Sequence, residues 1–268
     1  MNKFSFNRFQ KVVVRDFHNT LSLYGMSMLV MMLVPSAIWL IGLVFGLNYA
    51  DADGTDLVMR HMVVIIMAYL AAAIAPLKIY NSCNLRGKGN YFAMLPATLG
   101  EKFCSMLLYC FIVSPLAVFC GAYLVDTLLT LLPFGHNKDF LWNEPQWLNS
   151  LGEEINFGLP QIVLIFATQI FSYSAVFMFA NTIFKKHKFI FTVLWLMLIG
   201  YVVSIISIPI LMHVDWSGSF MATIAKWVEN TSPDKVLSII TWIGMLLNVL
   251  IAAVFSFFTY RRLKKMQY

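Results

Sequence analysis

Apolar residues fall along this chain in six long blocks that are separated by shorter polar segments. Each block is about as long as the 20 residues that an α-helix needs to cross the hydrocarbon core of a bilayer. The mean hydropathy is +0.74 and charged residues make up 12% of the chain, whereas a soluble domain carries about 25% charged residues. The pattern predicts an all-α integral membrane protein, with one transmembrane domain over residues 1–268 and a six-span bundle over residues 24–258. The predicted spans are Tyr24–Leu47, His61–Tyr80, Phe103–Val125, Pro160–Ile183, Phe189–Met212 and Leu237–Phe258.

The charged residues sort by side of the predicted bundle. If both chain ends lie on one side, that side holds 15 of the 19 Lys and Arg residues and two acidic residues, Asp16 and Glu101, for a net charge of +13. The opposite side holds four basic and 11 acidic residues, for a net charge of −7. Cytoplasmic segments of membrane proteins carry an excess of Lys and Arg. We therefore expect a multi-pass protein of the cell membrane, with both termini in the cytoplasm and no nucleic-acid partner.

The segment before the first span, residues 1–22, has the periodicity of an amphipathic helix. Its basic residues share one face of that helix, and the opposite face is apolar. The apolar face consists of Phe6, Phe9, Val13 and Phe17. An aromatic stripe with a basic back is typical of a helix lying in the membrane interface, where it can anchor the first span, dock a partner, or do both. Residues 259–268 form a short basic tail.

Two glycines near the end of the first span, Gly42 and Gly46, form a G-x-x-x-G pair. Small residues at this spacing let another helix approach closely. The contact can lie within the chain or between two copies of it.

Motifs of catalysis and metal binding are missing from the sequence. Around Gly87-Lys88, Ser82 stands where the first glycine of a P-loop belongs, and Gly89 where its Ser or Thr belongs. Neither H-E-x-x-H nor G-x-S-x-G occurs, and the four cysteines form no C-x-x-C pair. We therefore expect no enzyme activity, no metal and no cofactor in this chain, and we interpret the cysteines as apolar packing residues.

Polar residues within the spans are few and mostly uncharged. Asp126 lies at the outer end of the third span, where we expect it to be wetted. The fourth and sixth spans contribute Gln169, Ser172, Asn181 and Asn248. Such groups face the bundle or a cavity, so they either bond neighbouring helices or line a substrate path. Their lack of charge suits a bulky or amphipathic substrate better than an ion or a proton.

The segment Asn84–Phe103, between the second and third spans, combines basic residues and glycines with a helix signal. The signal is Leu95-Pro96-Ala97-Thr98-Leu99-Gly100-Glu101-Lys102. Pro96 suits the first turn of a helix, and we place Glu101 and Lys102 at its far end. The sequence thus predicts a short cytoplasmic helix between spans two and three.

This arrangement resembles the permeases of type-2 ABC transporters, a family of exporters with six spans per subunit. In that family a Leu-Pro-x-(Ser/Thr) stretch followed by Glu-Lys leads into the third span, as Leu95-Pro96-Ala97-Thr98 and Glu101-Lys102 do here. The N-terminal amphipathic segment is similar to the family's connecting helix. One departure is the outer segment Leu131–Leu159, which is longer than the family pattern.

The resemblance implies a permease subunit that works by alternating access in the lipid bilayer, paired with a second permease copy or a homologous permease. ATP and Mg²⁺ would bind to separate ABC ATPase subunits. The residues that would contact the ATPase are Leu95, Pro96, Thr98, Leu99, Glu101 and Lys102, with the two leucines as apolar anchors and Glu101 and Lys102 as a polar rim. The alternative is an accessory or assembly membrane protein in which Asn84–Phe103 is an ordinary loop. Substrate, transport direction and homodimer versus heterodimer stay open.

Overall fold

The computed structural model describes residues 4–45, 55–84, 96–132, 140–141, 159–213 and 233–266, and among these it contains helices and no strand. In chain order the elements are α1 (Phe6–Phe45), α2 (Thr55–Ile79), η1 (Asn81–Asn84), α4 (Leu99–Leu107), η2 (Leu108–Val113), α5 (Ser114–Thr130), α7 (Leu159–Ile183), α8 (Lys188–His213) and α10 (Pro233–Met266). Six helical stretches are long and apolar enough to cross a membrane, and each overlaps one predicted span. The prediction of an all-α, six-span membrane protein is confirmed.

The first helix, α1, is continuous over 40 residues, so no helix end separates the predicted interfacial segment, residues 1–22, from the predicted first span that begins at Tyr24. The physical reason is that neither Pro nor Gly occurs between Phe17 and Tyr24 to interrupt the backbone ladder. At about 1.5 Å per residue, a helix of this length extends roughly 60 Å, about twice the thickness of the hydrocarbon core. The amphipathic segment is therefore the projecting end of the first span.

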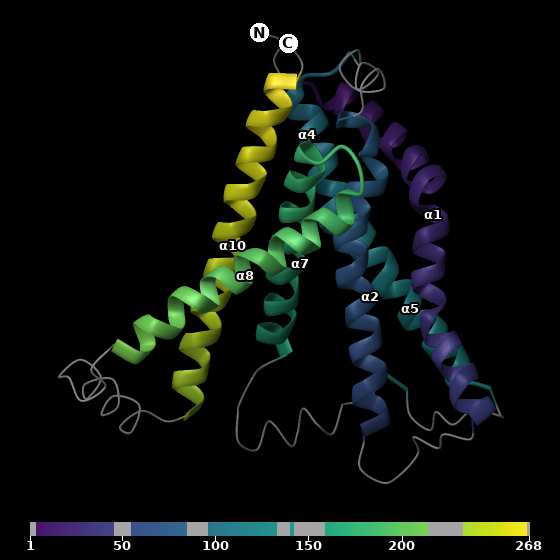
Figure 1. Cartoon of the computed structure of the whole chain (residues 1–268). Helices are drawn as coiled ribbons and strands as arrows, with labels where there is room; N and C mark the ends of the chain where they lie inside the picture. Colours follow the sequence, from purple (N-terminus) through teal and green to yellow (C-terminus); the bar gives the residue numbers. More distant parts are fainter. Residues whose placement is uncertain are drawn as a thin grey trace.

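The start of α1, the start of α4, the turn between α7 and α8 and the end of α10 gather at one end of the bundle, at the top of Figure 1. We call this the basic end, because the segments that carry the excess of Lys and Arg meet there. The N-terminal half of α1 descends from it along α4 and α5 (Figure 1). The basic end of the structure is thus the side that the charge count assigns to the cytoplasm.

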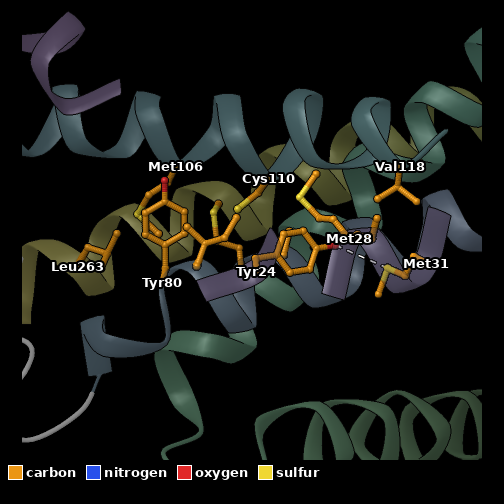
Figure 2. Packing of buried hydrophobic residues seen from close by; sticks show 12 residues of the cluster. Tyr24, Met28, Met31, Tyr80, Met106, Cys110, Val118 and Leu263 are labelled. Atoms are coloured by element: carbon orange, nitrogen blue, oxygen red, sulfur yellow. Dashed lines mark hydrogen bonds between the residues drawn. The ribbon is translucent and has the colours of Figure 1, made fainter. Parts of the chain in front are cut away.

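The hydrophobic core lies where α1, α2 and the third span cross (Figure 2). Buried residues of α1 recur every three or four positions from Val12 to Pro35, as one face of a helix does. Tyr24 lies at the centre of the core, and its hydroxyl donates a hydrogen bond of 3.3 Å to the Ala71 carbonyl of α2. Gly121 of α5 faces Met32 of α1 so closely that an added Cβ would lie 2.5 Å from the Met32 sulfur. A glycine of the third span therefore allows the close approach of α1 and α5.

The third span contains a π-helical turn, η2, between α4 and α5. Pro115 explains it, because proline lacks an N–H and its ring clashes with the carbonyl four residues earlier, and a wider turn relieves the clash. Pro76 likewise leaves the Ala72 carbonyl of α2 without its usual helical donor. The Ser174 hydroxyl of α7 lies within hydrogen-bond distance of the carbonyls of both Ala72 and Cys110, at 3.3 and 3.0 Å. The hydroxyl of one buried serine thus lies within hydrogen-bond reach of a backbone carbonyl in each of two neighbouring helices.

The helices α7 and α10 form a second packing unit, and α8 runs obliquely away from it (Figure 1). Ring contacts of Phe179 with Phe255 and Phe258 join α7 to α10. Between Phe189 and Ile205 of α8, Thr192 is the only buried residue. Because these exposed side chains are apolar, this stretch of α8 is suited to contact with lipid.

At the opposite end of the bundle, an ion pair joins α2 to α5. Arg60 Nε donates to Asp126 Oδ1 at 3.0 Å, and Arg60 Nη2 donates to Asp126 Oδ2 and to Thr130 Oγ1. Asp126 is buried, so the expectation that it is a wetted helix end is wrong. The two hydrogen bonds from Arg60 satisfy both carboxylate oxygens of Asp126, so the carboxylate does not need water as a hydrogen-bond donor.

Candidate functional site

The stretch that carried the family resemblance begins the third span. Thr98 is the N-cap of α4: its Oγ1 accepts a hydrogen bond from the Glu101 N–H, and Glu101 Oε2 accepts one from the Thr98 N–H at 2.8 Å. This reciprocal pair is a capping box. Glu101 and Lys102 therefore lie in the first turn of a helix that continues into the third span. Their predicted place at the far end of a separate short helix is wrong, and Leu95 lies outside the described residues.

Glu101 also holds the beginning of α1. Its Oε1 accepts hydrogen bonds from the Ser5 N–H at 2.7 Å and from Arg8 Nε and Nη2 at 3.3 and 3.1 Å. One carboxylate thus sits at the N-termini of two helices, where unpaired N–H groups and the helix dipole favour negative charge. This contact ties the first turn of α4 to the first turn of α1.

Asp16 forms a second tie, two turns further along α1. Its Oδ2 accepts hydrogen bonds from the Tyr80 hydroxyl at 3.0 Å and from the Ser105 hydroxyl at 2.7 Å, while Oδ1 accepts one from Arg15 at 2.8 Å. Tyr80 follows α2 and Ser105 lies in α4, so three elements meet at one buried carboxylate. The Tyr109 hydroxyl adds a hydrogen bond of 2.8 Å to the Val13 carbonyl.

We call these contacts of α1 with α4 and Tyr80 the α1–α4 junction. It contains both acidic residues of the basic end, and each is bonded to a neighbouring arginine. Lys102 is 2% exposed and Glu101 is fully buried. The prediction that Glu101 and Lys102 form a polar rim for a partner is therefore wrong, because both side chains are buried inside the protein.

The remaining described residues of the predicted ATPase contact differ in how far they are exposed. Pro96 is exposed, Thr98 is half-buried at the cap, and Leu99 is half-buried against the core. Gly100 has open space where a side chain would project. The accessible surface of this stretch is thus formed around Pro96 and Gly100.

The predicted aromatic face of the N-terminal segment is largely exposed. Phe6 and Phe17 are 71% and 48% exposed, and Phe9 and Val13 are half-buried. The buried face lies beside it, at Val12, Asp16 and Thr20. The aromatic stripe therefore remains available to lipid, while the adjacent face packs on α4 and α5.

The predicted substrate-path residues separate into two places. Gln169 Oε1 accepts a hydrogen bond from the Tyr69 hydroxyl, and the Ser172 hydroxyl lies 2.8 Å from the Gln169 carbonyl and 3.4 Å from Asn248 Oδ1. These contacts join α2, α7 and α10. Hydrogen bonding between helices, one of the two sequence-based alternatives, accounts for all three residues.

Asn181 lies apart from that group, in a buried network at the basic end. Its Nδ2 donates to the carbonyls of Pro76 and Tyr80 at 2.9 and 3.0 Å. Its Oδ1 accepts a hydrogen bond of 2.6 Å from Lys188 Nζ, which also donates to the Asn81 carbonyl at 3.0 Å. Asn181 therefore bonds the α7–α8 turn to the end of α2.

A cavity of about 460 Å³ lies on the surface of α1 and is lined by Asn7, Gln10, Lys11 and Val14. None of the predicted substrate-path residues belongs to it. In the described part of the chain, no group of three His, Cys, Asp or Glu side chains is placed to hold a metal ion.

Cys83 lies in η1 and packs against the core. Burial raises the pKa of its thiol to about 12, and the nearby Lys188 opposes the rise in part. The thiol stays protonated near neutral pH and is a poor nucleophile.

Gly42 is buried within this single chain, on the same face of α1 as Met31 and Pro35. Its position favours helix packing inside the chain over a contact between copies. Gly46 lies outside the residues that the structure describes.

The fold and the α1–α4 junction together define a six-span α-helical membrane protein whose N-terminal helix is bonded to the start of its third span. Comparison with family models, with curated proteins and with solved structures finds no match.

Proposed function

We propose that this chain is the membrane-spanning permease subunit of an ATP-driven ABC transporter, and that it exports a bulky or amphipathic substrate by alternating access. ATP and Mg²⁺ bind to separate ABC ATPase subunits, and a second permease copy or a homologous permease completes the pathway. The observation that carries the proposal is the double use of Glu101, which joins the start of α4 to the start of α1 directly beside the accessible Pro96–Gly100 surface.

The junction can transmit a displacement of this surface to α1. A subunit that presses on Pro96 and Gly100 displaces the first turn of α4. Through Glu101 it moves the first turn of α1, and through Ser105 and Asp16 it moves the second and third turns. Because α1 and the third span are continuous helices, movement at the basic end reaches the membrane core. Energy from a separate ATPase can in this way change the packing of two spans.

The test is a matched pair of glycine substitutions. Gly100→Leu places a bulky side chain at the proposed contact, and Gly244→Leu places the same side chain in open space on α10. We expect Gly100→Leu to lower ATPase association and ATP-dependent transport by roughly tenfold or more, the effect of obstructing an interface centre. Gly244→Leu should leave both unchanged.

The measurement uses the full chain, tagged and purified from its native membrane in mild detergent. It follows co-purification of an ABC ATPase and ATP turnover after reconstitution. Equal thermal stability of the two variants shows that the loss is one of docking. If no ATPase co-purifies with the unaltered chain, or if both variants behave alike, the accessory-protein alternative replaces the transporter.

A further inference from the structure

We propose that the basic end carries a binding surface for the headgroups of anionic phospholipids, built from the α7–α8 turn and the end of α10. We call it the cationic patch. It consists of six exposed basic residues, Lys185, Lys186, Arg261, Arg262, Lys264 and Lys265. This inference concerns the chain and its bilayer, and it does not rest on the transporter proposal.

The patch is assembled by tertiary structure from two segments far apart in the sequence. Arg262 Nε donates a hydrogen bond of 3.0 Å to the Thr182 carbonyl at the end of α7. Below this contact, the ring of Phe179 packs against Phe255 and Phe258. The basic end of α10 is thereby fixed beside Lys185 and Lys186.

The turn itself exposes its lysines. His187 adopts a left-handed backbone conformation with φ of 45°, which is uncommon for a residue other than glycine. Immediately after it, Lys188 is drawn inward to Asn181 and the Asn81 carbonyl. The buried Lys188 anchors the turn, and Lys185 and Lys186 are left outside it.

Among the residues that the structure describes, no acidic side chain forms an ion pair with the patch. The acidic residues that the structure describes at the basic end, Asp16 and Glu101, are both buried in the α1–α4 junction, where Arg15 and Arg8 take up their charge. The carboxylates of the basic end are thus paired within the junction, whereas the cations of the patch are exposed. Cations without acidic neighbours attract an external anion.

The position of the patch favours a lipid over an acidic protein as that anion. The Arg261 guanidinium lies over the ring of Phe257, 5.5 Å from its centroid, and Phe257 and Phe258 are 56% and 45% exposed. Exposed aromatic side chains of a span face lipid, so the guanidinium marks the line where the apolar lipid-facing surface ends. Phosphates of the headgroup layer lie at that level, and basic residues beside a span bind them.

The experiment measures phospholipid binding to the isolated full-length chain by native mass spectrometry. The chain in detergent is titrated with phosphatidylglycerol or with phosphatidylcholine. We expect tighter binding of phosphatidylglycerol and a loss of this preference as salt is raised, because exposed charges are screened. Equal binding of the two lipids would overturn the proposal.

Paired substitutions locate the site. Each lysine beside an anionic surface contributes roughly a fivefold gain in binding, so Lys185→Gln/Lys186→Gln and Lys264→Gln/Lys265→Gln should each weaken phosphatidylglycerol binding at least about tenfold. The control Lys11→Gln/Lys235→Gln removes two exposed charges outside the patch and should change binding less than about twofold.

Lys185→Arg/Lys186→Arg should restore binding, which separates loss of charge from misfolding. Unchanged phosphatidylglycerol binding in both patch variants overturns the proposal. If those variants instead lose a co-purifying ATPase, the patch belongs to a protein partner. Since lipid binding is measured without any ATPase, its outcome is independent of the transport test.

Discussion

At the scale of single residues, two carboxylates organise the basic end. Glu101 completes a capping box and also accepts hydrogen bonds from the start of α1, and Asp16 accepts hydroxyl donors from Tyr80 and Ser105. A buried carboxylate is costly unless its oxygens are satisfied. Each hydrogen bond to Asp16 or Glu101 therefore stabilises the fold, because it offsets part of the cost of burying the carboxylate.

Ser105→Ala tests this at one hydroxyl. A hydrogen bond to a buried charged group contributes about 1.5–3 kcal/mol, so we expect a loss of this size in the free energy of unfolding in detergent. Ser114→Ala is the matched control, because Ser114 is equally buried in the same span but does not contact Asp16. Equal losses of unfolding free energy for the two substitutions would show that the hydrogen bond from Ser105 to Asp16 adds no stability of its own.

At the scale of helices, the N-terminal segment behaves as the end of a span and not as an independent element. Its register against α4 is set by Arg8 and Ser5 at Glu101 and by Asp16 further along. Arg8 is partly exposed, so it holds the first turn less firmly than Asp16 holds the third. The first turn is the part of α1 that we expect to open most readily.

Arg8→Gln should therefore increase amide hydrogen exchange in two separate segments, the first turns of α1 and of α4. We expect a gain of roughly fivefold, corresponding to about 1 kcal/mol for a partly exposed ion pair. Hydrogen exchange read by mass spectrometry on the reconstituted chain measures it. Lys11→Gln, an exposed position one turn further on, should leave both segments unchanged. A gain confined to α1 would contradict the tie between the two helices.

At the scale of the whole molecule, α1, α2 and the third span pack around the core, α7 packs against both α2 and α10, and α8 is oblique and largely exposed. The described helices alternate in direction, so their ends sort into a basic end and an opposite end (Figure 1). From the distribution of Lys and Arg we predict the direction of this arrangement in the membrane.

The corresponding prediction concerns topology. In a variant without the native cysteines, Asp53→Cys and Lys138→Cys should react with an impermeant thiol reagent in intact cells, whereas Lys186→Cys should react only after the membrane is opened. The basic end then faces the cytoplasm, as the positive-inside rule requires. Labelling of Lys186→Cys in intact cells, with protection of the other two, would reverse the orientation.

Local signals in the sequence are sufficient for some features of the site and misleading for others. The spacing Thr98-x-x-Glu101 is the signature of a capping box and places the helix start at Leu99, whereas Pro96 alone favours an earlier first turn. The pairing of Glu101 with Arg8 has no such signal, because it joins residues 93 positions apart. The burial of Asp126 beside Arg60 has no local signal either, because the two residues are 66 positions apart.

Hydrophobic length and charge asymmetry are properties of consecutive residues, so the class of the molecule, its six spans and the side on which the basic residues gather can be predicted without a structure. The partners of the polar residues, in contrast, depend on how the helices pack. The tertiary structure placed Asp16 and Glu101 in a junction, used Asn181 and Ser174 to satisfy backbone carbonyls, and joined Arg262 of α10 to the Thr182 carbonyl of α7. In a low-dielectric interior each polar group must find a partner, and helix packing alone determines which partners lie within reach.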